Sequence, residues 1–186
     1  MADVQLTGVD RFGDRRQVAI TGSQLRVIAD MESEFKHESE GNSLSFTWNT
    51  VSADYAAADT MLIVQNTSPT LKLHIENVWF YTDNASEFDI HTINDATTPA
   101  GGTAVTGVCL NRAAPKIAEA AAHSDDTANS AQGNIIWTGT ILASTTYTVN
   151  YGGAVILGTN DAIAIDVTTA PGSLATAGIS GYYKET

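Results

Sequence analysis

Residues 61–86, MLIVQNTSPTLKLHIENVWFYTDNAS, contain the pattern that decides the fold. A short apolar run, Met61–Val64, ends in the turn-forming residues 66–69. Apolar and polar side chains then alternate over residues 71–76, which is the period of a β-strand with one solvated face. At Asn77 the alternation slips by one residue, and a slip inside a strand indicates a β-bulge. The stretch therefore predicts strands rather than helices.

The same period of two recurs on both sides of this stretch. Residues 44–49 alternate between apolar and polar side chains, and after the turn residues 83–86 the pattern resumes at Phe88. We therefore expect a β-hairpin around residues 83–86. Glycine pairs farther along, such as Gly152-Gly153, are interpreted as turns between strands. The further strands are expected at residues 104–110, 134–142, 146–151, 154–157, 162–168 and 177–183.

Only two stretches are compatible with a helical turn, residues 53–59 and 113–123, and Pro115 interrupts the second. About nine short strands at intervals of about 8–12 residues, without alternating helices, predict an all-β fold. The expected architecture is an antiparallel β-sandwich or barrel, and a jelly roll fits the number of strands.

Charged and aromatic residues divide the chain into two parts. The 186 residues carry a net charge of -12. Residues 1–42 are dense in both signs of charge, whereas residues 43–186 contain all three Trp and all six Tyr. We therefore expect residues 1–42 to form an extended charged arm for attachment or oligomerisation, and residues 43–186 to form the packed β-sandwich domain.

Composition also excludes several classes of protein. An excess of negative charge disfavours direct binding to nucleic acid and to anionic membranes. Cys109 is the only cysteine, so disulfide frameworks and multi-cysteine metal sites are excluded and a buried thiol is expected. The sequence lacks an apolar run of the length that spans a bilayer, and its N-terminus does not resemble a signal peptide. We expect a soluble protein outside the secretory route.

The sequence contains no catalytic or cofactor-binding motif that stands out. Residues 153–158 have the glycine spacing of a P-loop but lack its lysine. His74 and His91 fall on the polar phase of their strands, where solvated imidazoles are expected. Residues 125–129 and 160–161 could offer oxygen ligands to Ca²⁺, although loop capping explains them more simply. We therefore expect no enzyme activity, no cofactor and no metal.

One cluster in the N-terminal arm suggests a contact site. Arg11, Phe12, Arg15 and Arg16 form the only dense basic cluster of an acidic protein, beside an aromatic ring that can anchor in a pocket. We expect this cluster to contact an acidic protein surface. The alternative is a solvated terminal tail.

Three stretches together resemble a family of viral proteins. They are residues 61–86, GVCLNRAAPKIAEAAAHSDD (107–126) and GGAVILGTNDAIAIDVTTAPG (152–172). They resemble the jelly-roll structural proteins of tailed bacteriophages, especially the decoration or cement proteins that bind capsid shells as trimers. The resemblance covers residues 60–181 and no part of residues 1–42.

The resemblance implies a non-enzymatic virion structural protein that stabilises the capsid shell. It would be made in the cytoplasm of the host bacterium and would be located on the capsid surface. Its partners would be copies of itself, as a homotrimer, and the major capsid protein of the shell.

Two other functions remain open. A receptor- or glycan-binding β domain of a tail fibre or head fibre would stack aromatic rings on sugars, and the candidate exposed aromatics are Trp79, Tyr182 and Tyr183. For Trp79, however, packing in the core is the expected use. A jelly-roll enzyme with acidic residues far apart in the chain is the third reading. Glycan binding and turnover of polysaccharides distinguish these two from the structural role.

Overall fold

The computed structural model describes residues 45–112, 115–130 and 132–185, together with four short strands nearer the N-terminus. These four are β1 (Thr7–Val9), β2 (Arg15–Gln17), β3 (Ile20–Thr21) and β4 (Gln24–Leu25). The chain divides into two compact units, residues 1–34 and 35–186. In the first unit β1 pairs with β2 and β3 pairs with β4, both antiparallel. The boundary expected after Asn42 lies outside the described residues.

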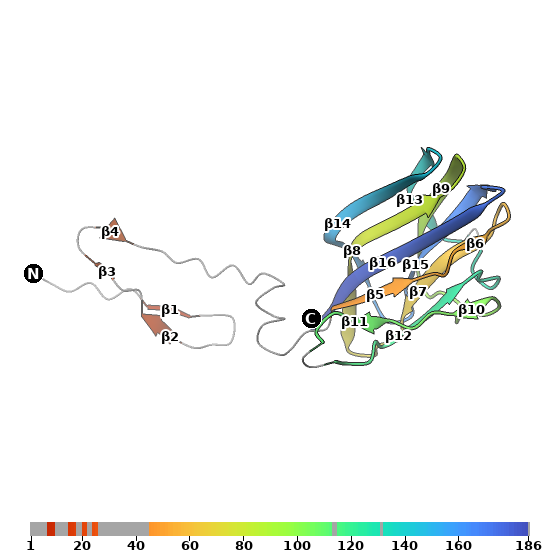
Figure 1. The fold of residues 1–186 in the computed structure, drawn as a ribbon. Coiled ribbons are helices and arrows are strands. Elements are labelled where there is room, and N and C mark those ends of the chain that lie inside the picture. The colour runs from red at the N-terminus through yellow and green to blue at the C-terminus, as the bar shows by residue number, and fades with distance from the viewer. Residues whose placement is uncertain are drawn as a thin grey trace, which may run out of the picture. The chain divides into compact units, whose positions relative to one another are not determined.

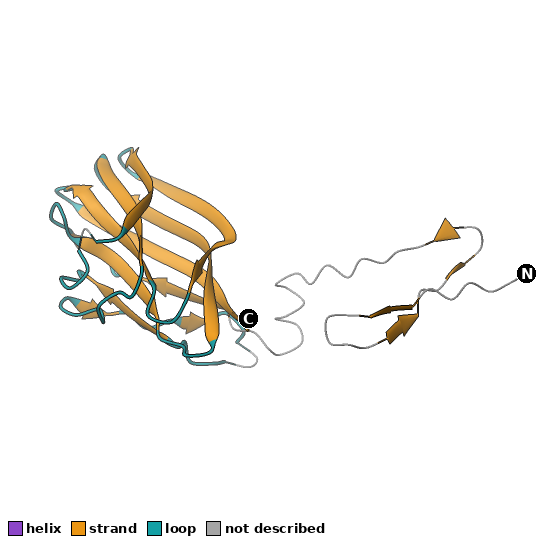
Figure 2. Cartoon of the chain, turned by 180° about the vertical axis from the view of Figure 1, so that it is seen from behind, coloured by secondary structure: helices purple, strands orange, loops and turns teal. Residues whose placement is uncertain are grey.

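All regular secondary structure in the described part of the second unit is β-strand (Figures 1 and 2). The strands are β5 (Ser45–Asn49), β6 (Ala53–Asp54), β7 (Thr60–Asn66), β8 (Leu71–Thr82), β9 (Ser86–Ile93), β10 (Thr103–Ala104), β11 (Val108–Cys109), β12 (Ala120–Ser124), β13 (Asn134–Ile141), β14 (Thr145–Leu157), β15 (Ala162–Thr169) and β16 (Leu174–Glu185). No helix in the described ranges is long and apolar enough to cross a membrane.

The two stretches compatible with a helical turn contain strands instead. β6 lies within residues 53–59, and β12 lies at the end of residues 113–123. β12 is rich in alanine, which favours helices in isolation. Its backbone pairs with β7 over four positions, and this tertiary pairing overrides the local preference.

The strands of the second unit form two antiparallel sheets that pack face to face. The first sheet has the order β10-β12-β7-β15-β9-β13. The second sheet has the order β11-β5-β16-β8-β14, and β6 also pairs with β16. The antiparallel β-sandwich expected from the period of two is therefore confirmed.

Eight of the strands pair in a nested order along the chain. β5 pairs with β16, β7 with β15, β8 with β14 and β9 with β13, all antiparallel. The pairs β16–β8 and β15–β9 join these ladders into the two sheets. β10, β11 and β12 come from the segment between β9 and β13, and they extend the sheets beyond β7 and β5. β13 and β14 are therefore the last strands on the other side of the sandwich (Figure 1).

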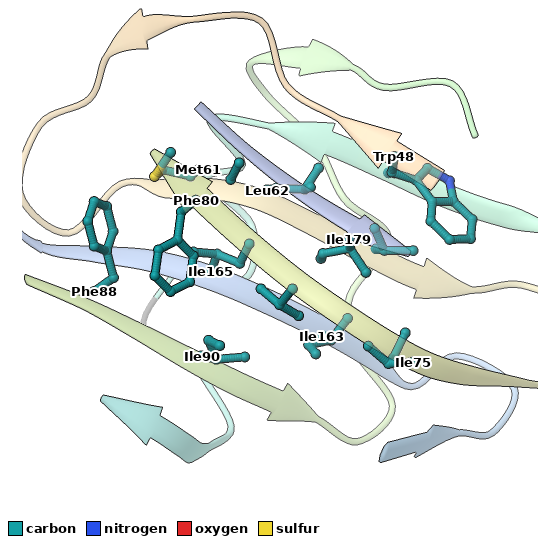
Figure 3. Packing of buried hydrophobic residues seen from close by; sticks show 14 of the residues in the cluster. Trp48, Met61, Leu62, Ile75, Phe80, Phe88, Ile90, Ile163, Ile165 and Ile179 are labelled. Atoms are coloured by element: carbon teal, nitrogen blue, oxygen red, sulfur yellow. The ribbon is translucent and has the colours of Figure 1, made fainter. Parts of the chain in front are cut away.

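The core lies between the two sheets and consists of alternate side chains of the strands. Phe80 of the second sheet stacks on Phe88 of the first, with ring centroids 5.2 Å apart. Figure 3 shows these rings beside the apolar side chains of both sheets. The largest fully buried side chains include Trp48, Phe46, Phe80, Phe88 and Met61. The free thiol of Cys109 is buried as expected.

The β-bulge expected near Asn77 is confirmed. The buried side chains of β8 switch from odd to even positions between Ile75 and Val78. On β16, Ser180 pairs with Asn77 and the following residue pairs with Ile75, so Glu76 is the additional residue. The bulge lets one long strand keep apolar side chains toward the core on both sides of the slip.

β8 and β9 do not form the expected hairpin. β8 belongs to the second sheet and β9 to the first, so residues 83–85 carry the chain across the sandwich. The Asn84 side chain fixes this crossing by donating from Nδ2 to the carbonyl oxygen of Pro171 at 3.0 Å. The strand expected over residues 104–110 likewise separates into β10 and β11, which lie in different sheets. A polar connection has the same kind of sequence whether the chain turns back within one sheet or crosses to the other sheet.

Gly152-Gly153 is not a turn between two strands. β14 continues through both glycines, and its register against β8 shifts between Asn150 and Val155. The glycines have φ values of 55° and 80°. Because a tight turn and a strand bulge both require positive φ, the glycine pair does not distinguish them in sequence.

A second, smaller apolar cluster lies on the outer face of the first sheet. It consists of Ile63, Ile93, Ala96, Ala162 and Ala164. Ala96 comes from the segment between β9 and β13, and its carbonyl oxygen accepts a hydrogen bond from Gln65 Nε2 at 2.6 Å. This segment therefore covers part of the outer face.

Candidate interaction surface

The expected basic contact site lies in the N-terminal unit. Arg15 and Arg16 belong to β2, where they pair with Val9 and Gly8 of β1. Arg11 and Phe12 lie outside the described residues. The contact of this cluster with an acidic surface stays a prediction.

The three candidate ligand-facing aromatics occupy two different environments. Trp79 and Tyr182 are half-buried on the outer face of the second sheet, whereas Tyr183 is only 3% exposed and packs edge-on against Phe46. The expectations that Tyr183 is exposed and that Trp79 packs in the core are therefore both wrong. Consecutive side chains of a strand point to opposite faces, and the Tyr-Tyr pair alone does not show which ring faces the core. Burial, with a smaller effect of the Glu119 carboxylate, raises the pKa of Tyr183 well above its usual value.

Trp79 and Tyr182 have mainly polar neighbours, and Lys72 and Lys184 lie on the same face beyond Tyr182. Tyr182 stacks on His74, with ring centroids 5.0 Å apart and planes inclined by 15°. The Trp79 indole lies over Gly178, where a Cβ atom would come within 2.2 Å of its Nε1. Trp79 is aligned with Thr148 and Gly178, and Tyr182 is aligned with Ser45 and His74. Between the two rings lies a row of mutually aligned polar residues, Thr47, Ser180, Asn77 and Asn150. This face offers aromatic rings, amides and hydroxyls.

Two of the acidic residues considered as Ca²⁺ ligands, Asp126 and Asp161, cap turns. The Asp126 carboxylate accepts hydrogen bonds from the backbone N–H groups of Ala100 at 2.6 Å and Asn129 at 2.8 Å. The Asp161 carboxylate accepts one from Gly158 N–H at 2.9 Å. Loop capping is thus confirmed for Asp126 and Asp161. Among the described residues, no three His, Cys, Asp or Glu side chains are grouped to hold a metal ion.

The histidines within the described ranges have separate surroundings. His74 and His123 each lie near a backbone carbonyl oxygen, at 3.1 Å and 2.8 Å. His91 Nε2 lies 3.4 Å from Asp166 Oδ2, and both side chains are 7% exposed. The expectation that His91 is solvated is wrong, because the outer face of the first sheet is partly covered. His37 lies outside the described residues.

The main group of exposed apolar side chains lies on β13, β14 and the turn between them, residues 134–157, which we call the β13–β14 edge. Its exposed apolar side chains are Ile135, Ile136, Leu142, Tyr147 and Ile156. They are half of the exposed large apolar side chains in the part of the chain that the structure describes. Within the same part, β13 pairs only with β9 and β14 only with β8. One side of the sandwich therefore presents two strand borders together with apolar side chains.

Aromatic packing connects this edge to the core. The rings of Trp137 and Tyr147 are 5.4 Å apart, and they lie 5.4 Å and 6.0 Å from the ring of Phe80. Phe80 is fully buried, whereas Tyr147 is 43% exposed. On the same strand, burial raises the pKa of Tyr151 to about 12. Trp137 and Tyr147 thus join the inner face of the edge to the core.

Sequence reasoning did not identify the β13–β14 edge, although the sequence contains a signal for it. No Asp, Glu, Lys, Arg or His occurs between Thr127 and Asn160, the longest such stretch in the chain. Edge strands of soluble proteins commonly carry charged residues, especially Lys, or Pro, which prevent pairing with other chains. β13 and β14 contain neither.

Comparisons with known proteins add no assignment to this geometry. The chain matches no protein-family model, no curated protein and no solved structure. Function is therefore inferred from the residues and contacts described above.

Proposed function

We propose that this protein is a non-enzymatic structural protein of a virion, a decoration or cement protein that binds a bacteriophage capsid shell as a homotrimer. The observation that carries the proposal is the nested pairing of eight strands, first with last and fourth with fifth. A jelly roll is an eight-strand, two-sheet sandwich whose connections make two Greek keys. The nested order supports this topology, and with it the resemblance to phage jelly-roll proteins.

The N-terminal unit supports a role in attachment. Its described strands form two separate two-stranded sheets, β1–β2 and β3–β4. Isolated two-stranded pairs are marginally stable in water unless another surface covers them. β2 also carries Arg15 and Arg16, whose charge suits an acidic partner. The proposed partner of this unit is the major capsid protein.

The net charge of -12 supports a position on the outside of a shell. A protein with this charge is repelled by packaged nucleic acid, whose phosphates carry the same sign. It is also kept from aggregating before assembly, because copies repel one another at long range.

The proposed mechanism is the addition of interface area. A decoration protein whose site spans neighbouring capsid subunits binds the assembled shell but not the separate subunits. Every bound copy then stabilises the shell by mass action. An interface of roughly 800 Å² on each partner is enough for specific binding.

The test compares particles that carry the protein with particles assembled without it. The decorated particles should survive heating or osmotic shock that opens the undecorated ones, and the purified protein should bind shells but not free capsid subunits. Equal resistance of the two kinds of particle to heating or osmotic shock, or equally tight binding to free subunits, would contradict the proposed decoration function.

A second candidate function, glycan binding by a fibre domain, is favoured by the outer face of the second sheet. Trp79 and Tyr182 present rings there on a face with amides and hydroxyls such as Asn77, Thr148 and Ser180, which suits stacking on a sugar. The test is a glycan array probed with the native protein, with Trp79→Ala and with Tyr183→Phe as the control. Binding that Trp79→Ala abolishes and Tyr183→Phe retains favours this function, and an array without signal removes it.

A further inference from the structure

We infer that the β13–β14 edge is the surface through which copies of this chain associate. This inference deepens the proposed function by naming the contact surface of the oligomer. It rests on that function only for the number of copies, three. The edge is identified by its exposed apolar side chains, by the pairing of β13 and β14 on one side only among the described strands, and by its lack of charged residues.

The exposed apolar side chains lie on both faces of the edge. Tyr147 is aligned with Phe80, a core residue, so it points to the inner face and yet is 43% exposed. Ile156 is aligned with His74 on the outer face and is 50% exposed. A partner that covers one sheet face would bury only one of these two. In a ring of three copies each edge contacts two neighbours, and both faces can be buried.

The backbone of the edge is also open to a partner. In an antiparallel ladder, about half of an edge strand's N–H and C=O groups point away from its neighbour. The eight residues of β13 span about 27 Å, at about 3.4 Å per residue. Its bulge at Ile136 lies near the start, which leaves residues 137–141 regular. An identical copy supplies strand borders of the same length and the same threonine-rich composition.

The charge distribution favours a second copy as the occupant. Two chains with a net charge of -12 repel each other, so they associate best where neither brings carboxylates into the contact. The edge contributes no charged residue, and the nearest acidic side chains in the first sheet, Glu87 and Asp89, lie one strand farther in, on β9. A basic partner would be attracted to the acidic surfaces of the chain and would gain nothing electrostatically at this edge.

The interface area that stable association of two copies needs is a small part of the surface of one chain. A standard interface buries roughly 800 Å² per partner. That is less than a tenth of the chain's accessible surface of 10638 Å².

The experiment measures the mass of the purified full chain by light scattering at micromolar concentration, with no shells present. The wild-type protein should have a mass of about three times 19.6 kDa. The double variant Thr138→Glu/Thr146→Glu places carboxylates on exposed positions of β13 and β14, so neighbouring edges repel. Its mass should fall to that of one chain.

The matched control is Thr70→Glu/Thr98→Glu, which adds the same charge at exposed loop positions outside the edge. The control should keep the wild-type mass. A monomeric wild-type protein, an edge variant that keeps the wild-type mass, or a control that dissociates equally would each overturn the inference.

Hydrogen exchange of the wild-type protein covers the case in which the edge variant does not fold. The amides of residues 137–141 and 145–150 that point away from β9 and β8 should lose protection when the protein is diluted below its association range, while amides of β15 should not. Protection that is independent of concentration would overturn the inference. These tests use no shells, so the two proposals can fail separately. A monomeric protein that coats particles would contradict the edge and the homotrimer but not the decoration function. A protein that associates through the edge but does not bind particles would contradict only the decoration function.

Discussion

At the end of β7, the side chain of Asn66 joins segments that are far apart in the chain. Asn66 is fully buried. Its Nδ2 donates to the carbonyl oxygens of Leu71 and Leu157 at 2.9 Å and 3.0 Å, and its Oδ1 accepts from Ser68 N–H at 3.0 Å. The sequence predicts a turn over residues 66–69. In the structure Asn66 is still the last residue of β7, and the connection to β8 begins at Thr67. Its bond to Leu157 was not predictable, because that contact depends on how the strands pair.

Asn66→Asp should lower the free energy of unfolding by about 3–5 kcal/mol. The aspartate cannot donate to the two carbonyl oxygens, and it places a buried charge beside them. Chemical denaturation at pH 7 measures the change. The control, Asn84→Asp, removes one donor at an exposed position and should cost about 1 kcal/mol. Equal losses for the two variants would contradict the role of Asn66.

The phenol of Tyr183 should make stability depend on alkaline pH. Its pKa is raised in the folded protein, mainly by burial, and its Oη has no hydrogen-bond partner among the described residues. Below the ordinary value of 10.0 the phenol is neutral in both states, so this group contributes no pH dependence. Above it, the unfolded chain loses the proton first, and the free energy of unfolding should fall by up to about 1.4 kcal/mol per pH unit.

Tyr183→Phe should therefore flatten the decline in stability above pH 10 and leave stability at pH 7 within about 1 kcal/mol of the wild type. Denaturant unfolding between pH 8 and 11 measures both effects. Tyr151, whose pKa is raised to about 12, remains in both proteins and supplies a common background. An unchanged alkaline slope would mean that the Tyr183 phenol does not stay protonated in the folded state.

A single strand is predicted well where the pattern of apolar residues within that strand is sufficient to identify it. The alternation of β5, the fully buried β7 and the bulge of β8 are all visible in their own residues. Errors arise where the answer depends on a partner strand. The period of two shows that β8 and β9 are strands, yet it does not show that they belong to different sheets.

Gly102, in the loop between β9 and β10, tests how tightly this loop packs against the end of β12. Gly102 and Gly172 both have positive φ, 50° and 59°. A Cβ on Gly102 would come 1.9 Å from the carbonyl oxygen of Ser124, whereas one on Gly172 would meet nothing within 4 Å. Both substitutions carry the strain of an L-residue at positive φ, and only the first must also displace backbone.

Gly172→Ala should cost about 1 kcal/mol, and Gly102→Ala should cost at least about 2 kcal/mol more. Thermal and denaturant unfolding of the two variants measure the difference. If Gly102→Ala is no worse than Gly172→Ala, the loop between β9 and β10 adapts easily and is only loosely attached to the end of β12.

At the scale of the whole molecule, the sequence predicts an all-β sandwich but not the surface most suited to contacts. The period of two is a local property, so it identifies strands residue by residue. The location of a strand at the border of a sheet is a property of pairing. The sequence of β13 therefore resembles that of any half-buried strand. Only the absence of charged residues between Thr127 and Asn160 distinguishes it as an exposed edge. The candidate aromatics show the same limit, since Tyr182 and Tyr183 differ only in which face each one takes.

The two-unit organisation leads to the last prediction. Residues 1–34 form a unit separate from the sandwich, so deleting residues 2–34 should leave the unfolding midpoint of the sandwich within about 2 °C, less than about 1 kcal/mol. The truncated protein keeps β13 and β14 and should keep the wild-type oligomeric mass. Binding to capsid shells should be lost, because the deletion removes Arg11, Phe12, Arg15 and Arg16. Calorimetry, light scattering and co-sedimentation with particles measure the three properties. A truncated protein that coats particles at full occupancy would show that attachment resides in the sandwich, and one that becomes monomeric would show that the N-terminal unit, rather than the β13–β14 edge, holds the copies together.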